Sequence, residues 1–141
     1  MNFHECLEEG YIKKDESTKI RVENSIKLAE KFLHAAEKNL EINENTMGEI
    51  AAYNSIFHSL RALLFSAGYR ERSHYCLMVA VEELFPDLLK EHMQAIHRVR
   101  MRRHQVQYDG IDVSREEVKM VIELAGELLG KIKEYFSKAS E

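Results

Sequence analysis

Residues 47–67 read MGEIAAYNSIFHSLRALLFSA, and the apolar residues in this segment cover most sides of a helix. A helix that is apolar all round is buried, so residues 47–67 are predicted to form the central helix of a bundle. Thr46 and Glu49 have the spacing of a capping box at its start, and Gly68 marks its end. The large apolar residues of the stretch are Ile50, Tyr53, Ile56, Phe57, Leu60, Leu63, Leu64 and Phe65.

Two flanking helices are predicted from single apolar stripes. In residues 17–39 an apolar side chain recurs every three or four positions from Val22 onward. Residues 114–136 give the clearest helical pattern, because Ser114 and Glu117 form a capping box before a long apolar stripe. Each stripe is expected to face the central helix.

Two more helices are predicted between Gly68 and Ser114. The shorter one is capped by Ser73 and ends at Phe85–Pro86. The other runs from about Asp87 to Tyr108, with Pro86 in its first turn, where a missing N–H costs nothing. Asp109–Gly110 ends this helix, which is apolar at its start and strongly basic afterwards.

The expected fold is therefore all-α, an up-and-down bundle of four main helices plus one short helix. The connections are short, so neighbouring helices are expected to pack antiparallel. Residues 1–141 are expected to form a single domain. Residues 1–16 show no strong period, and we expect a flexible segment or one that packs on a partner. No strand is predicted.

The composition excludes several other classes of protein. The chain has 141 residues, of which 45% are hydrophobic and 31% charged, with one proline and no tryptophan. So few turn-forming residues argue against an all-β fold, and this balance of residues argues against disorder. No apolar run approaches the ~20 residues that cross a bilayer, and the N-terminus has no signal-peptide pattern. We therefore expect a cytoplasmic protein without a membrane segment.

Neither cysteines nor histidines indicate a metal site. Cys6 and Cys76 are too few, and too far apart in the sequence, to indicate a disulfide framework or a zinc site, and they suit a reducing compartment. His92 and His97 are five residues apart, which is a poor spacing for two metal ligands on one helix. We expect no metal and no cofactor.

The strongest candidate for a functional surface is the basic stretch His97–His104, closed by Tyr108. Between His92 and Tyr108 there are four arginines, three histidines and no acidic residue. This segment carries +4, which leaves −8 on the other residues of a chain whose net charge is −4. A basic island on an acidic protein indicates a local anion site rather than a long track for nucleic acid.

On a helix, the side chains of this stretch divide between faces. Arg100, His104 and Tyr108 follow one another at intervals of four residues and share one face. Arginines bind phosphate oxygens in pairs and a histidine transfers protons near neutral pH, so this face holds the groups needed to cleave RNA without a metal. His97 and Arg103 flank this face, and Arg98 and Arg102 point further round.

An alternative is that these arginines form a solvated surface paired with the acidic helices. Exposed charge runs usually serve solvation alone, and from charge by itself this alternative is favoured. The lack of any carboxylate within the stretch keeps the anion site open as an interpretation.

Three segments of the chain resemble the HEPN-domain family, a family of small helical domains associated with nucleotides. They are Ala52–Leu64 in the central helix, Arg70–Leu77 at the start of the short helix, and Arg103–Tyr108 with the capped helix that follows. Together with the order of the helices, the resemblance covers nearly the whole chain.

The family's hallmark is an arginine followed after four to six residues by a histidine, and Arg98 and His104 satisfy it with five residues between them. The resemblance implies that these two residues cleave RNA without a metal, in a cleft formed across a homodimer. It also implies a toxin–antitoxin system, since many members are toxins neutralised by a small nucleotidyltransferase. In some pairs the partner modifies a tyrosine after the histidine, which here would be Tyr108.

The chain departs from the family pattern at two positions. Val99 follows Arg98 directly, where active members usually have a polar residue, and Tyr108 lies four residues past His104 rather than two. Six positions separate Arg98 from His104, which places them about 120° apart on a straight helix. The two would then meet only across a dimer or beyond a bent helix end, and Arg100 would be the nearer substitute.

Two functions therefore stay open. The first is a metal-independent endoribonuclease in which Arg98 and Arg100 hold the scissile phosphate and His104 is the general acid or base. The second is a non-catalytic module that binds RNA or a nucleotide through the same surface and partners a nucleotidyltransferase. Val99 favours the module, and the hallmark pair favours the enzyme. The remaining members of the anion-binding surface are Arg102, Arg103, His97 and Tyr108.

Three polar residues outside the stretch complete the candidates. Asn54 and His58, one turn apart on the central helix, are candidates to line the same cleft. For His58 the alternative is a buried histidine bonded to a neighbour. His74, next to Ser73, is expected to be no more than a helix-start residue.

Overall fold

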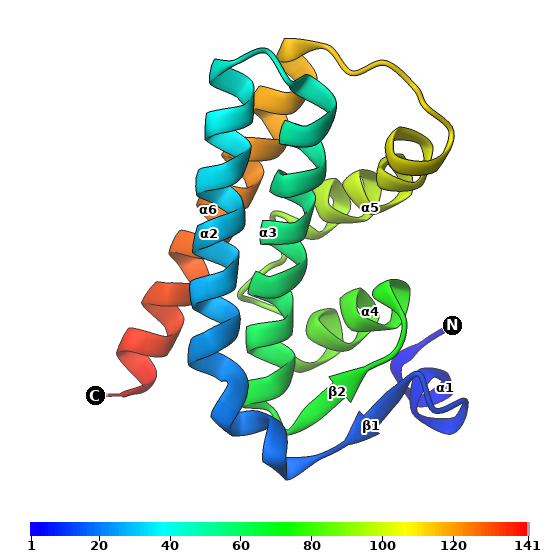
Figure 1. Cartoon of the computed structure of the whole chain (residues 1–141). Helices are drawn as coiled ribbons and strands as arrows, with labels where there is room; N and C mark the ends of the chain where they lie inside the picture. Colours follow the sequence, from blue (N-terminus) through cyan, green and yellow to red (C-terminus); the bar gives the residue numbers. More distant parts are fainter. Residues whose placement is uncertain (141) are drawn as a thin grey trace.

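The computed structural model describes residues 1–140, and its framework is three long helices that lie side by side (Figure 1). They are α2 (Val22–Glu41), α3 (Asn45–Ser66) and α6 (Arg115–Ala139). Two shorter helices, α4 (His74–Leu84) and α5 (Met93–Tyr108), lie together on one side of α3 at an angle to it. The predicted all-α bundle is confirmed.

α3 is the central helix, as the sequence predicted. It is buried along most of its length and contacts α2, α4, α5 and α6. α2 and α6 each bury one stripe, which includes Ala29 and Ala36 on α2 and Leu128 and Ile132 on α6. None of the helices in residues 1–140 is long and apolar enough to span a membrane.

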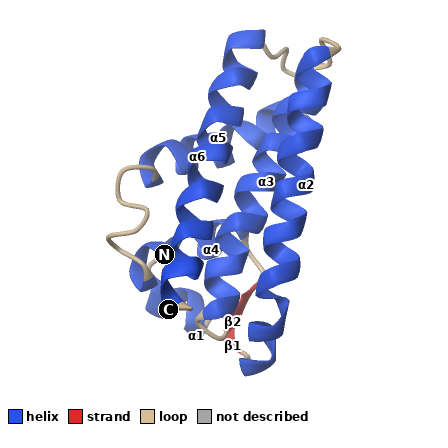
Figure 2. Ribbon diagram, turned by 90° about the vertical axis from the view of Figure 1, so that its left-hand side faces the viewer, coloured by secondary structure: helices blue, strands red, loops and turns tan. Residues whose placement is uncertain are grey.

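The first 16 residues, for which the sequence predicted no element, contain regular structure. They form α1 (Phe3–Glu8) and β1 (Ile12–Lys14), followed by a 3-10 helix (Glu16–Arg21) that leads into α2. β1 pairs antiparallel with β2 (Tyr69–Glu71), which follows α3 and precedes α4 in the chain, so that Ile12 is paired with Glu71 (Figure 2). The prediction of no strand is wrong here, because three-residue strands are too short to show alternation.

A disulfide joins α1 to α4. Cys6 and Cys76 are 70 positions apart in the sequence, but the pairing of β1 with β2 brings their Cα atoms to 5.9 Å. Both side chains are buried. The prediction for these cysteines is therefore wrong, because the distance between two cysteines depends on the fold and not on their separation in the sequence.

Two of the three predicted N-terminal helix caps are confirmed. Ser73 accepts a hydrogen bond from the backbone of Cys76, and Ser114 and Glu117 form the predicted capping box. The capping box at Thr46 is wrong, because α3 begins two residues earlier, after Glu44, and its N-cap makes no side-chain hydrogen bond. Glu49 instead points inward and pairs with α5.

α5 begins later than predicted. The sequence placed its start at Asp87, with Pro86 in the first turn, whereas residues 85–92 run as turns and bends and the helix starts at Met93. Leu89 is fully buried from within this irregular segment. Its apolar character therefore reflects burial rather than helical period. The predicted end at Asp109–Gly110 is confirmed, with Gly110 at φ +67°.

Candidate functional site

The basic stretch predicted from the sequence lies on α5, which is held to the bundle along one side. Ile96 and Val106 are buried, and Val99 packs against the main core. The basic side chains emerge around this apolar edge in two groups. One group faces α6, and the other faces the N-terminal end of α4.

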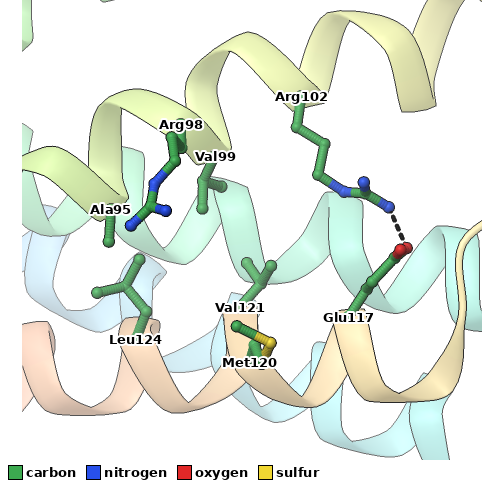
Figure 3. A pocket seen from close by; sticks show the side chains of 8 residues that line it. All are labelled: Ala95, Arg98, Val99, Arg102, Glu117, Met120, Val121 and Leu124. Carbon is green, nitrogen blue, oxygen red and sulfur yellow. Dashed lines mark hydrogen bonds and ion pairs between the residues drawn. The ribbon is translucent and has the colours of Figure 1, made fainter.

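Arg102, on the α6 side, is committed to an ion-pair network. Its Nε donates to Glu49 at 3.0 Å, and its terminal nitrogen donates to Glu117 (Figure 3). Glu49 is only 3% exposed, and burial raises the pKa of its carboxyl group despite the nearby Arg102. The sequence grouped Arg102 with the anion-binding residues, but its guanidinium ties α5 to α3 and α6.

Arg98 lies at the mouth of a pocket of about 250 Å³ between α5 and α6. Figure 3 shows its side chain extending toward Ala95 on α5 and Leu124 on α6. Val121 and Met120, also on α6, line the same pocket. The lining is largely apolar, and no carboxylate pairs with Arg98 within residues 1–140. Its guanidinium therefore stays available to an anion.

His104 and Tyr108 form a small exposed unit near the end of α5. Their ring centroids are 5.2 Å apart, in agreement with the predicted shared face. Arg98 and His104 are both exposed, and no contact joins them within the described chain. Between them on the helix surface lies Met101, which is 65% exposed. One copy of the chain therefore does not bring the hallmark pair together.

Arg100 and Arg103 point toward α3 and α4, where they lie on aromatic rings. The guanidinium of Arg100 lies 5.3 Å from the ring centroid of Tyr75, and that of Arg103 lies 5.3 Å from that of Tyr53. Arg103 also lies 5.7 Å from the ring of Tyr108. Neither arginine forms an ion pair among residues 1–140.

His97 is the only other residue of the stretch with a carboxylate partner in the described chain. Its Nε2 hydrogen-bonds Glu82 on α4, and its ring meets that of Tyr75 edge-on. The alternative of a solvated surface paired with acidic helices thus describes His97 and Arg102 only. Arg98, Arg100 and Arg103 are left without such partners.

The HEPN-domain family model matches residues 22–135, which is most of the chain. The chain belongs to the HEPN-domain family. Membership supports a function related to RNA or nucleotides. A search of curated proteins found no match.

The HEPN domain has a second group of aromatic and basic residues that the sequence did not assign to the site. Tyr53, on α3, and His74, the first residue of α4, are joined by a 2.6 Å hydrogen bond between the phenol oxygen and Nδ1. From the sequence, Tyr53 is predicted to be an apolar core residue, and His74 is predicted to be a helix-start residue. The sequence feature that could have identified His74 as a site residue is its place in the first helical position, directly after the capping Ser73.

His58 and Asn54 lie on α3, but no hydrogen bond or ring contact joins either to α5 within residues 1–140. The imidazole of His58 stacks on Phe32 with centroids 5.5 Å apart, and its buried Nδ1 has no hydrogen-bond partner in this range. Burial, with the charges of Arg61 and His74, lowers the pKa of His58 to about 4. The alternative of a histidine bonded to a neighbour therefore does not describe it.

The described residues hold no group of three histidine, cysteine, aspartate or glutamate side chains that could bind a metal ion. Three arginines on α5 have no ion-pair partner in the described part of this HEPN domain, namely Arg98, Arg100 and Arg103. We refer to Arg98, Arg100, Arg103, His104 and Tyr108 as the α5 surface.

Proposed function

We propose that this HEPN domain binds RNA through the α5 surface and cleaves it without a metal, in a cleft between two copies of the chain. The observation that carries the proposal is that Arg98, Arg100 and Arg103 lack carboxylate partners within residues 1–140, beside an exposed His104. Unpaired cations on one helix repel one another, and a bound polyanion would offset that repulsion. A phosphate backbone is such a ligand.

In the proposed reaction His104 accepts the proton of a ribose 2′-hydroxyl, and the 2′-oxygen attacks the adjacent phosphorus. Arg98 and Arg100 donate hydrogen bonds to the phosphorane oxygens as negative charge develops on them. The bond between phosphorus and the 5′-oxygen then breaks, and a protonated histidine supplies the proton for the leaving oxygen. The acid is the same His104 that took the 2′-hydroxyl proton, so one site needs His104 from one copy of the chain and Arg98 from the other.

The arrangement of α5 supports a site shared by two copies. Arg98 and His104 are about 120° apart around the helix, so in a single copy their side chains leave α5 in different directions. Met101 lies between them and is 65% exposed, while Met120 beside the Arg98 pocket is 69% exposed. A second copy that covers these methionines would bring its own His104 toward Arg98.

The proposed cleavage is tested with purified protein and mixed tRNA in the presence of EDTA. We expect cleavage by the wild type and none by His104→Ala. The matched control is His34→Ala, which removes an exposed histidine on α2 and is expected to cleave like the wild type. If neither wild type nor control cleaves RNA, the proposed reaction is wrong.

A mixing experiment tests whether the site is shared. Arg98→Ala and His104→Ala are each expected to be inactive alone. In an equal mixture, each mixed dimer regains one complete site, so about a quarter of the wild-type activity should return. If the mixture is as inactive as its components while wild type is active and dimeric, the two residues do not act together across an interface.

A specific observation favours a second function, a non-catalytic module that binds RNA or a nucleotide. Val99 takes the place of a polar residue after Arg98, and its side chain packs against the core, where it offers no polar group to a substrate. RNA binding that depends on the α5 surface, without cleavage, would support the module. The proposed toxin–antitoxin role belongs to the endoribonuclease, and the proposed small nucleotidyltransferase partner belongs to both functions. Copurification with the product of an adjacent reading frame tests the partner.

A further inference from the structure

The buried Tyr53 and the half-buried His74 form a pair beside two unpaired arginines. The phenol oxygen of Tyr53 lies 2.6 Å from Nδ1 of His74, and the two rings are nearly parallel, with an interplanar angle of 8°. Tyr53 is 2% exposed, so its side chain is fixed by the packing of α3. Phe57 covers another side of His74, edge-on at 4.3 Å between centroids.

The protonation of this pair follows from its surroundings. Burial raises the pKa of Tyr53 to about 12 despite the nearby Arg103 and Arg100, so the phenol keeps its hydrogen at neutral pH. Burial, and then Arg103, Arg100 and Arg61, lower the pKa of His74, so its imidazole is neutral. No carboxylate is among the charges that act on either group.

These protonation states select one tautomer of His74. The phenol of Tyr53 has a single hydrogen and no other hydrogen-bond partner within residues 1–140. It therefore donates to Nδ1, which leaves the imidazole hydrogen on Nε2. Nε2 has no hydrogen-bond partner among the described residues, and His74 is only partly buried, so Nε2 can donate to a ligand.

The neighbouring guanidinium groups are donors as well. Arg100 and Arg103 each lie over an aromatic ring, and those rings restrict their orientation without occupying the planar N–H donors. Nε of Arg100 is buried and has no hydrogen-bond partner in residues 1–140. By contrast, Arg61, whose charge also acts on His74, donates to Glu71 at 2.7 Å. The free polar groups around His74 are thus donors without acceptors.

We propose that His74, Arg100 and Arg103, with Tyr53 as a positioning residue, form a phosphate-binding subsite within one chain. Nε2 of His74 and the two guanidinium groups would donate to the oxygens of one phosphate, either in an RNA strand or on a mononucleotide. Tyr108, which is 60% exposed and lies against Arg103, offers a ring on which a base can stack. The choice of phosphate as the ligand rests on the proposed function, but the subsite uses neither Arg98 nor His104.

The test is a titration of protein with 15N-labelled histidine, followed by NMR of the imidazole rings at low ionic strength. The ligands are inorganic phosphate, a 5′-mononucleotide and a short oligoribonucleotide. We expect saturable shifts of the His74 resonances and, in the saturated complex, a raised pKa of His74. The tighter of the two nucleotide ligands identifies whether the phosphate comes from a strand or from a mononucleotide.

Variants assign the effect to the proposed donors. Arg103→Gln and His74→Gln should each weaken binding by about tenfold or more, because a charge-assisted or geometrically fixed hydrogen bond is lost. Arg21→Gln removes an exposed arginine at the end of the 3-10 helix, away from α5, and should bind like the wild type. Tyr53→Phe keeps the ring but removes the donor, so the 15N spectrum should show His74 losing its preference for the Nε2–H tautomer.

The proposed subsite is wrong if none of the three ligands shifts the His74 resonances of the wild-type protein. Equal affinity of Arg103→Gln and wild type would also overturn it. Phosphate binding without RNA cleavage supports the subsite and contradicts only the proposed reaction. RNA cleavage by the wild type, together with unchanged ligand affinity in Arg103→Gln and His74→Gln, supports the proposed reaction and contradicts only the subsite.

Discussion

His58 should make this protein sensitive to mild acid. In the unfolded chain its pKa is the ordinary 6.5, and in the folded chain burial and the charges of Arg61 and His74 lower it to about 4. The unfolded state therefore binds a proton first as the pH falls. The stability contributed by neutral His58 is complete above pH 6.5 and is lost as the pH falls toward 4.

The size of this effect follows from the two pKa values. A difference of 2.5 units corresponds to at most about 3.4 kcal/mol, of which about 2 kcal/mol is already lost between pH 8 and pH 5. His58→Phe keeps the stacking on Phe32 and removes the titration. The variant should therefore lose about 2 kcal/mol less than the wild type over this interval.

The assay is urea denaturation at pH 8 and at pH 5, followed by far-UV circular dichroism. The wild type, His58→Phe and His34→Gln are compared, the last as a control for removing an exposed histidine. The wild type and His58→Phe share all other titrating groups, so the difference between their pH dependences isolates His58. If His58→Phe loses as much stability as the wild type, burial does not keep His58 neutral.

Three further changes have defined outcomes. Arg102→Met leaves the buried carboxylate of Glu49 unpaired and should cost about 3–5 kcal/mol in urea denaturation; adding Glu49→Gln should restore part of this, and a double variant no more stable than the single one would contradict the pairing. Reduction of the disulfide between α1 and α4 should lower the unfolding free energy by about 4 kcal/mol, because it releases a closed loop of 70 residues; equal urea midpoints with and without reductant would contradict this. Gly68→Ala should cost about 1–2 kcal/mol by thermal denaturation, since Gly68 has φ +83°, and an unchanged melting temperature would show that the turn relaxes.

The helices could be predicted because each has a strong local signal. The apolar surface of α3 identified the centre of the bundle, and Ser114 with Glu117 fixed the start of α6 within one residue. The start of α5 could not be found in this way, since Leu89 is buried from a turn and looks the same in sequence as a helical core residue. The strands β1 and β2 could not be predicted, because three residues are too few to show the alternation of apolar and polar side chains.

The location of the candidate site on α5 could be predicted from the sequence, but which of its arginines are paired with carboxylates could not. Spacing grouped the four arginines of α5 together, and only the fold shows that Glu49 and Glu117 occupy Arg102. The partners of Arg100 and Arg103 come from α3 and α4, far away in sequence. Tyr53 also has the sequence character of a core residue, so its polar role follows only from the position of His74.

The covalent link between α1 and α4 turns residues 6–76 into a closed ring that contains all of α2 and α3. Cleavage of one peptide bond inside this ring opens the ring without releasing a fragment. A protein nicked in the exposed turn at Asn43, between α2 and α3, would therefore migrate as one species without reductant and as two with it. Its central helix pair would stay tethered to the rest of the molecule even after the backbone has been cut.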